Sequence, residues 1–328
     1  MIRLLILVSS FIAMLAARQA VVDPPCNGWM LHTRTLPTIC PELVTDVPAA
    51  IGAPAIWGLA FGANGDLYFT RPAAGQVMRM VAHEAHFFDP PQVIADGLDF
   101  PNGIACAPDA CYVTTQTDIV RVDFKDGTTR VIFSGLAAQH IHPLHIGADH
   151  LLYTIRGRQL IRLATDGSGV SVVSDLPDVG DSAADFDWAA HGEMWASDGS
   201  AAIHSADSVN NKLIAVEANS QPAGLAFYHG AAFPQFANGL LCVTSGSYNA
   251  LTFTGYALLF IPFDNNGQPG SVTRLIPADT DRTLSDAALS LLTFFPQHPI
   301  ALAISPQGWI YIALREGEIV RLRPRVNA

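Results

Sequence analysis

The sequence predicts an all-β fold, a six-bladed β-propeller whose ring is closed by an N-terminal strand. Three observations lead to this prediction. One strand–turn–strand motif recurs six times, a further strand follows the motif in several copies, and an N-terminal segment repeats the pattern of that further strand. Units of this kind cannot each bury a core alone, so they stack around a common axis.

The first copy of the motif sets its pattern. Residues 57–61 (W-G-L-A-F) predict a strand, 64–66 a tight turn, 67–69 a second strand and 77–81 a third. The second strands of the six copies are marked by Tyr68, Tyr112, Tyr153, Trp195, Cys242 and Tyr311. A spacing of roughly forty residues is typical of propeller blades. The last interval is longer and contains an insertion, with a short helix predicted over 286–292.

A fourth strand is predicted over 92–96, 130–134 and 172–175. The last copy has no such strand, because the chain ends soon after Arg323. Residues 43–48 (L-V-T-D-V-P) resemble 172–177 (V-V-S-D-L-P), so we expect them to supply the missing strand. Closing the ring in this way removes exposed sheet edges. The rival fold is an array of β-sandwiches.

The N-terminus predicts export. Arg3 precedes an uncharged apolar run over 4–17, which is short for a membrane span and typical of a signal peptide. Arg18 interrupts a clean cleavage site, so an uncleaved anchor is the alternative. We expect a signal peptide over 1–20, a Cys-paired lead segment over 21–42 and the propeller over 43–328. The mature protein is then secreted or periplasmic, with no stable membrane insertion.

Five cysteines fit an oxidising compartment. Cys26 and Cys40 bracket the lead segment, and Cys106 and Cys111 flank a predicted hairpin turn, so both pairs are candidate disulfides. Cys242 lies in an apolar stretch and predicts a buried free thiol. The spacings fit no zinc motif.

The charge pattern excludes one class of partner. The formal net charge is −11, and Lys125 and Lys212 are the only lysines. Nucleic-acid binding needs a clustered basic face, which this sequence lacks. Small molecules are therefore the expected partners.

Functional residues of a propeller come from the loops that precede the first strand and follow the second strand of each blade, around the channel. These loops offer Thr70, Arg71, Pro101, Asn102, His140, His142, Arg156, Asp181, Asp185, Asp198, Ser245 to Asn249, His298 and Arg315.

Three histidines stand within six residues. By period-two alternation His140 and His142 share a face, while His145 faces away. A histidine at the channel mouth can act as a general base near neutral pH. The alternative is a polar loop that makes ordinary hydrogen bonds.

The fourth copy is acidic, with Asp185, Asp187, Glu193 and Asp198. These carboxylates suit a calcium ion, and solvated loop carboxylates are the alternative interpretation.

The fifth copy gives a more specific signal. P-A-G-L-A-F-Y-H-G over 222–230 is followed by Phe233-Pro234, by S-G-S-Y-N over 245–249 and by Gly255-Tyr256. This order resembles the quinoprotein glucose/sorbosone dehydrogenase family, and 57–67 and 298–321 resemble its first and last blades. The resemblance spans roughly residues 43–323.

The resemblance implies a six-bladed propeller that binds pyrroloquinoline quinone (PQQ) over the channel with the help of calcium. It implies oxidation of a sugar hydroxyl, in which a base takes the proton and hydride passes to the quinone. The implied base is His140, and the implied cofactor contacts are His142, Ser245, Tyr248, Asn249 and His298. The electron acceptor is not implied.

The sequence departs from the family pattern at several positions. Ser245 and Tyr248 replace a histidine and a tryptophan, and His298 replaces an arginine. No Arg-Asn pair precedes Phe186, and the family's calcium loop is missing before residue 212. Two other functions are therefore kept: a non-catalytic propeller that binds a ligand or a protein, and a metal-dependent lactonase-type propeller. The second usually has a glutamate before the first-blade tryptophan, where Ala55-Ile56 stand here.

Overall fold

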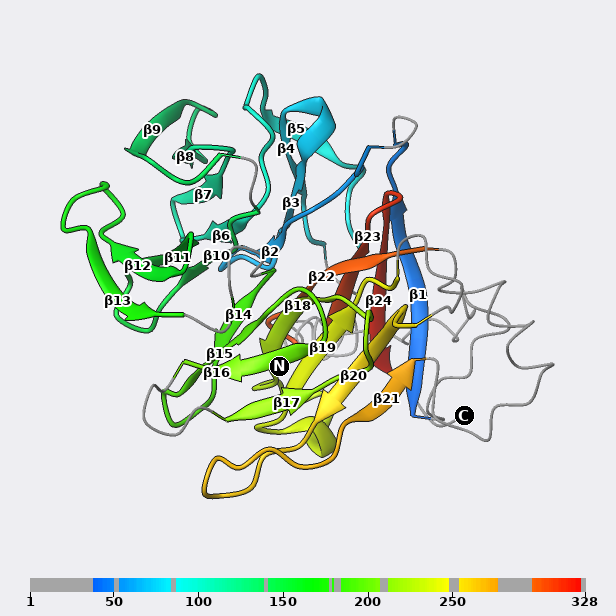
Figure 1. Ribbon diagram of the computed structural model, residues 1–328. Helices are drawn as coiled ribbons and strands as arrows, with labels where there is room; N and C mark the ends of the chain where they lie inside the picture. The colour runs from blue at the N-terminus through cyan, green and yellow to red at the C-terminus, as the bar shows by residue number, and fades with distance from the viewer. Residues whose placement is uncertain are drawn as a thin grey trace, which may run out of the picture.

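The computed structural model describes residues 38–49, 53–83, 87–138, 141–176, 179, 184–206, 212–247, 254–276 and 297–325. Its strands form six four-stranded antiparallel sheets, arranged with their inner strands around a common centre (Figure 1). The predicted six-bladed β-propeller is confirmed.

Each blade is a meander of neighbouring strands. Blade 1 consists of β2 (Leu59–Phe61), β3 (Leu67–Arg71), β4 (Gln76–Met80) and β5 (Gln92–Ala95). Blade 2 consists of β6 (Ile104–Cys106), β7 (Ala110–Thr114), β8 (Asp118–Asp123) and β9 (Thr129–Ser134). Blade 3 consists of β10 (Leu144–Ile146), β11 (Leu152–Arg156), β12 (Gln159–Leu163) and β13 (Ser171–Asp175). Blade 4 consists of β14 (Phe186–Trp188), β15 (Met194–Ser197), β16 (Ala202–Ser205) and β17 (Leu213–Ala215). Blade 5 consists of β18 (Pro222–Phe227), β19 (Leu240–Thr244), β20 (Ala257–Ile261) and β21 (Thr273–Ile276). Blade 6 consists of β22 (Pro299–Ile304), β23 (Ile310–Leu314), β24 (Glu318–Pro324) and β1 (Ile39–Asp46). In the described part of the chain, blade 1 also contains the short 3-10 turn η1 (Pro72–Ala74) and blade 5 the short 3-10 turn η4 (Pro234–Phe236).

The second strands are the most buried elements because neighbouring blades cover both of their faces. Every residue of β7, β19 and β23 is buried. All six predicted marker residues lie in second strands, which explains why β-branched and aromatic residues recur there. The predicted helix over 286–292 lies outside the described residues.

The core is divided into six apolar clusters, one between each pair of neighbouring blades. Tyr68 and Val113 belong to the cluster between blades 1 and 2, for example, and Phe69 and Tyr311 to the cluster between blades 6 and 1. The others join blades 2 and 3, 3 and 4, 4 and 5, and 5 and 6. Six clusters for six blades mean that the ring is closed by packing as well as by pairing.

Ring closure follows the prediction, with one difference at its boundary. β1 pairs antiparallel with β24 and supplies the fourth strand of blade 6. It begins at Ile39 rather than at residue 43, so the end of the expected lead segment belongs to the propeller. The Glu42 carboxylate, whose side chain is 12% exposed, accepts hydrogen bonds from Arg321 Nε at 2.7 Å and Arg323 Nε at 3.0 Å.

The cysteines behave as expected where the structure describes them. Cys106 and Cys111 form a disulfide between paired residues of β6 and β7. Cys40 is disulfide-bonded, and its partner lies outside the described residues. Cys242 is a buried free thiol, and burial raises its pKa.

Candidate functional site: the central channel

The inner strands present one repeated segment to the channel, and blades 3 and 4 differ from the rest. One position is alanine in four blades (Ala60, Ala105, Ala226, Ala303), but it is His145 in blade 3 and Asp187 in blade 4. Two residues earlier the small residues are Gly58, Gly103, Gly224 and Ala301, whereas blade 4 has Asp185. Two adjacent blades therefore place three titratable side chains at positions where the other four blades have only glycine and alanine.

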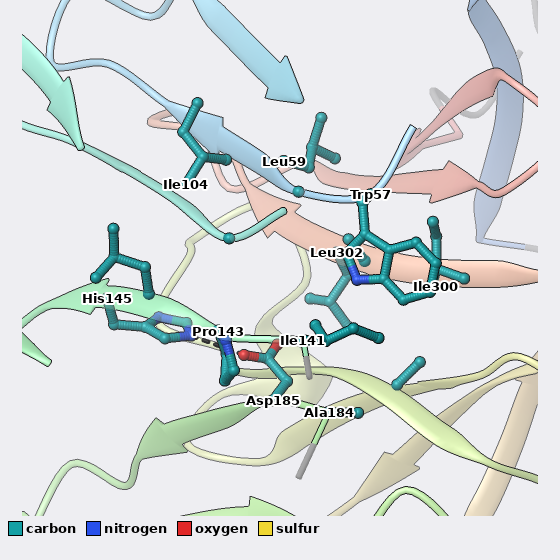
Figure 2. A pocket seen from close by; sticks show the side chains of 15 residues that line it. Trp57, Leu59, Ile104, Ile141, Pro143, His145, Ala184, Asp185, Ile300 and Leu302 are labelled. Carbon is teal, nitrogen blue, oxygen red and sulfur yellow. Dashed lines mark hydrogen bonds and ion pairs between the residues drawn. The ribbon is translucent and has the colours of Figure 1, made fainter. Parts of the chain in front are cut away.

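These side chains line two cavities along the channel. The first, of about 60 Å³, is bordered by Trp57, Ile141 and Pro143, and by His145 and Asp185 (Figure 2). The second, of about 280 Å³, is lined by His145 and Asp187 and by aliphatic residues of the inner strands. His145 thus contacts both cavities. We call the end of the channel at which the first strands begin the Asp185 end.

Hydrogen bonds fix the geometry of this group. His145 Nε2 lies 2.8 Å from Asp185 Oδ1 (Figure 2), so this nitrogen carries the proton that it donates to the carboxylate. The second oxygen of Asp185 accepts the Leu225 N–H at 2.8 Å, and Asp187 accepts the Phe227 N–H at 2.7 Å. The inner strand of blade 5 is a sheet edge with free N–H groups, and the two carboxylates satisfy them. One polar group therefore connects blades 3, 4 and 5.

The electrostatics of the group follow from its partial burial. Burial lowers the pKa of His145, but the charges of Asp185 and Asp187 and the Asp185 hydrogen bond more than offset this effect, so the pKa is raised overall. Burial raises the pKa of Asp187, and the positive charge of His145 offsets only part of the increase. The side chain of His145 remains 28% exposed, so the channel keeps it accessible.

The sequence analysis predicted functional roles for His140 and His142 instead. It expected His145 to face away from His140 and His142, and it gave His145 no role. Alignment of the six inner segments would have identified it, because His145 and Asp187 interrupt a column of alanines.

His142 is buried against the backbone. Its ring atoms Nδ1 and Nε2 each lie 3.0 Å from a carbonyl oxygen, of Ile155 and Ala137 respectively. Its backbone N–H donates to Asn102 Oδ1. The Thr114 hydroxyl donates to the His142 carbonyl at 2.6 Å. These contacts connect blades 2 and 3, and the cofactor-binding role of His142 stays a prediction.

Ser245 and His298 lie at the Asp185 end of blades 5 and 6. Ser245 follows β19, is buried, and its hydroxyl lies 3.4 Å from Gln221 Oε1. His298 precedes β22, pairs with Glu316 through Nδ1, and has its ring 5.2 Å from that of Tyr256. His140, Tyr248 and Asn249 lie outside the described residues, so their roles stay predictions.

The Asp185 end carries cationic and unpaired polar groups. Arg71 and Arg156 are the last residues of β3 and β11, and neither forms an ion pair within the described part of the chain. The buried Nε of Arg71 has no hydrogen-bond partner in the described part of the chain. The same holds for three buried polar atoms in residues that precede β18, β20 and β22, which are Ser220 Oγ, Thr254 Oγ1 and Gln297 Oε1. Buried polar groups without partners are rare. The Arg71 Nε–H and the two hydroxyls can donate to an anionic group of a ligand, whereas Gln297 Oε1 can accept a hydrogen bond from a ligand hydroxyl.

The acidic residues of blade 4 do not gather around one point. Asp198 accepts backbone N–H groups of its own turn, and Glu193 pairs with Lys212 at 3.0 Å. No group of three or more His, Cys, Asp or Glu side chains among the described residues could hold a metal ion.

Comparison with known proteins supports the fold. The strictosidine synthase-like N-terminal family matches residues 284–322, which include β22, β23 and most of β24 of the last blade. Among solved structures, a carbohydrate-active enzyme of family AA12 from Trichoderma reesei has 13% identity and a TM-score of 0.68, over 90% of this chain and 98% of that one. No curated protein sequence matches significantly.

Two further solved structures are similar over most of their length. The PQQ domain of pyranose dehydrogenase from Coprinopsis cinerea has 11% identity and a TM-score of 0.65, over 92% of this chain and 98% of that one. A gluconolactonase from Xanthomonas campestris has 14% identity and a TM-score of 0.58, over 88% and 91%. At these identities the likeness establishes the propeller fold alone.

In the described part of the chain, no helix is long and apolar enough to cross a membrane.

Proposed function

We propose that the protein is a divergent PQQ-dependent sugar dehydrogenase, secreted or periplasmic, that oxidises a sugar hydroxyl at the Asp185 end of the channel. The observation that carries this proposal is that Arg71 and Arg156, which form no ion pair in the described part of the chain, lie at that end together with buried polar atoms that have no hydrogen-bond partner there. The similarity to a PQQ domain of pyranose dehydrogenase supports it.

Several residues of this chain would hold the cofactor. PQQ is a flat molecule with three carboxylates, and guanidinium groups are well suited to bind carboxylates. Arg71 and Arg156 would bind these carboxylates, and Ser245, Tyr248, Asn249 and His298 would position the ring. When bound, the quinone supplies the hydride acceptor.

His140 would take the proton of the sugar hydroxyl as the general base, since it lies four residues before β10 in the sequence and β10 begins at this end. Pro143 and Ile141, which border the first cavity, would limit access of water from the channel. Calcium, which the family resemblance implies, finds no group of three ligands among the described residues.

The residues of blade 4 predict a low turnover rate for the proposed oxidation. The resemblance expects an arginine before Phe186 to stabilise negative charge on the quinone, but Asp185 and Ala184 directly precede it. Loss of one such stabilising donor costs roughly 10²–10³ in kcat. We therefore expect slow turnover compared with enzymes that carry the arginine.

The test is dye reduction by the mature protein reconstituted with PQQ and calcium in the presence of aldoses. We expect PQQ-dependent reduction that His140→Ala lowers by roughly 10² or more. His150→Ala, a change at an exposed turn residue between β10 and β11, is the matched control and should keep full activity. Absence of dye reduction with every aldose would refute the dehydrogenase, and unchanged activity of His140→Ala would refute the base.

A non-catalytic binding propeller is the second candidate, and the replacement of the blade-4 arginine favours it. The two candidates separate in one experiment. A protein that binds sugar at the Asp185 end but reduces no dye with PQQ belongs to the second class.

A further inference from the structure

We infer that a groove between blades 3 and 4, remote from the Asp185 end, is a binding site for a neutral saccharide. Its lining includes Trp188, His191, Glu193, Met194 and Lys212, with Asn266 from blade 5. We call it the Trp188 groove. It lies by the β14–β15 hairpin turn, at the opposite end of β14 from Asp185.

The groove has the size of a ligand site. Its volume is about 530 Å³, within the range of about 300–1,000 Å³ typical of small-molecule sites. It is larger than either channel cavity, of about 60 and 280 Å³. A disaccharide-sized molecule is therefore a suitable occupant.

The charges in the groove cancel one another. Glu193, whose side chain is only 9% exposed, lies 3.0 Å from Lys212 Nζ. Ser205 donates to the other carboxylate oxygen at 2.6 Å, and His191 Nε2 lies 3.0 Å from Glu193 Oε2. Because carboxylate and ammonium neutralise each other, neither an anion nor a cation is favoured, and a neutral ligand avoids the cost of burying a charge.

Hydrogen-bonding capacity remains at the edge of the groove. Lys212 has three N–H donors, and two of them bind Glu193 and the Gly267 carbonyl. The third has no partner among the described residues. The Asn266 side-chain amide lies at an exposed turn and hydrogen-bonds the Asp264 carboxylate. An amide has two N–H donors and one acceptor oxygen, so one donor and the oxygen remain for a ligand. A donor next to an amide that both donates and accepts matches the alternating hydroxyls of a sugar ring.

The opposite wall is apolar. Trp188 is half-buried against Tyr153 and Phe186, which fixes the position of its indole, and Val173 is 46% exposed. The C–H faces of a pyranose pack on such surfaces, while its hydroxyls bind polar groups at the rim. A site with one apolar wall and one polar, uncharged edge recognises a saccharide by both properties.

Isothermal titration of the protein without quinone tests the inference, with glucose and cellobiose as probes. We expect cellobiose to bind more tightly than glucose. Asn266→Ala should weaken cellobiose binding about fivefold, as expected for one lost hydrogen bond, and Trp188→Ala about tenfold or more. Asn266→Ala leaves the fold intact because its side chain contacts solvent. Gln92→Ala removes an exposed amide from blade 1 and should change nothing.

Two results would overturn the inference. One is the absence of binding by either sugar at about 10 mM, far above a millimolar dissociation constant. The other is binding that neither Asn266→Ala nor Lys212→Met affects, which would place the sugar elsewhere. Because the titration contains no quinone, the site can fail while the proposed dehydrogenase activity stands, and the reverse also holds.

Discussion

Three side chains, His145, Asp185 and Asp187, give the channel its charge. They occupy positions that are glycine or alanine in blades 1, 2, 5 and 6, so they are not needed for the propeller to form. Instead they connect the inner strands of blades 3, 4 and 5 through hydrogen bonds of 2.7–2.8 Å. A protonated His145 strengthens this connection.

His145→Gln tests this connection through its pH dependence. The pKa of His145 is raised in the folded protein, so its stabilising effect is fully present below the unfolded value of about 6.5. The effect is lost as pH rises through the folded value. We therefore expect the difference in melting temperature between wild type and variant to be largest below about pH 6.5 and to shrink as pH rises through the raised pKa of the folded state. A difference that does not vary with pH would contradict this account.

Thr114→Val tests a contact between blades 2 and 3. The buried Thr114 hydroxyl lies 2.6 Å from the His142 carbonyl and 2.8 Å from Asn102 Oδ1. The hydroxyl has one hydrogen to donate, and Asn102 Oδ1 also accepts the backbone N–H groups of Gly103 and His142. The loss therefore leaves the buried His142 carbonyl without this donor, which should cost about 1–3 kcal/mol of unfolding free energy. Denaturant unfolding measures this cost, and exposed Thr129→Val is the control. Equal stability of the two variants would show that the contact contributes nothing.

The residue scale is also where the sequence was least informative. Alternation along 140–145 separates His142 from His145, but it does not say which one faces the channel. That depends on how β10 pairs with β11 and on the neighbouring blade, which are contacts distant in sequence. Asp185 likewise looked like a loop carboxylate, because its partner His145 is 40 residues away.

At the scale of elements, β1 is the critical strand, because it joins the two ends of the propeller. Its position was predictable from the likeness between 43–48 and 172–177. Its start at Ile39 was not, because Ile39 and Cys40 pair with Pro324 and Arg323 at the far end of the sequence. The six second strands were found correctly because their marker residues are apolar in every blade.

Glu42→Gln tests the closure of the ring. Glu42→Gln removes the negative charge with which the buried guanidiniums of Arg321 and Arg323 both pair. Breaking a buried ion pair in this way costs about 3–5 kcal/mol, so the urea midpoint should fall strongly.

Glu217→Gln is the matched control for ring closure, since it disrupts a more exposed pair with Arg274. It should cost only about 0–1 kcal/mol. Equal losses for the two variants would show that closure does not depend on the Glu42 cluster.

At the scale of the whole molecule, six clusters between blades hold a ring with two distinct polar regions. The Asp185 end carries the arginines and unpartnered polar atoms, and the Trp188 groove lies at the opposite end of β14. The fold was predictable because it repeats. The function was less so, because the propeller is common to a sugar dehydrogenase domain and a lactonase and the distinguishing residues lie in single loops.

The most direct test of the account is equilibrium dialysis of the mature protein against PQQ, without sugar or dye. The account predicts that one PQQ is retained per chain and that Arg156→Gln weakens retention about tenfold or more, as expected for a lost charge-assisted contact. Arg162→Gln, which removes a half-exposed arginine of β12, should bind PQQ as the wild type does. Failure to retain PQQ, or equal retention by both variants, would contradict the proposal that the Asp185 end is a quinone site.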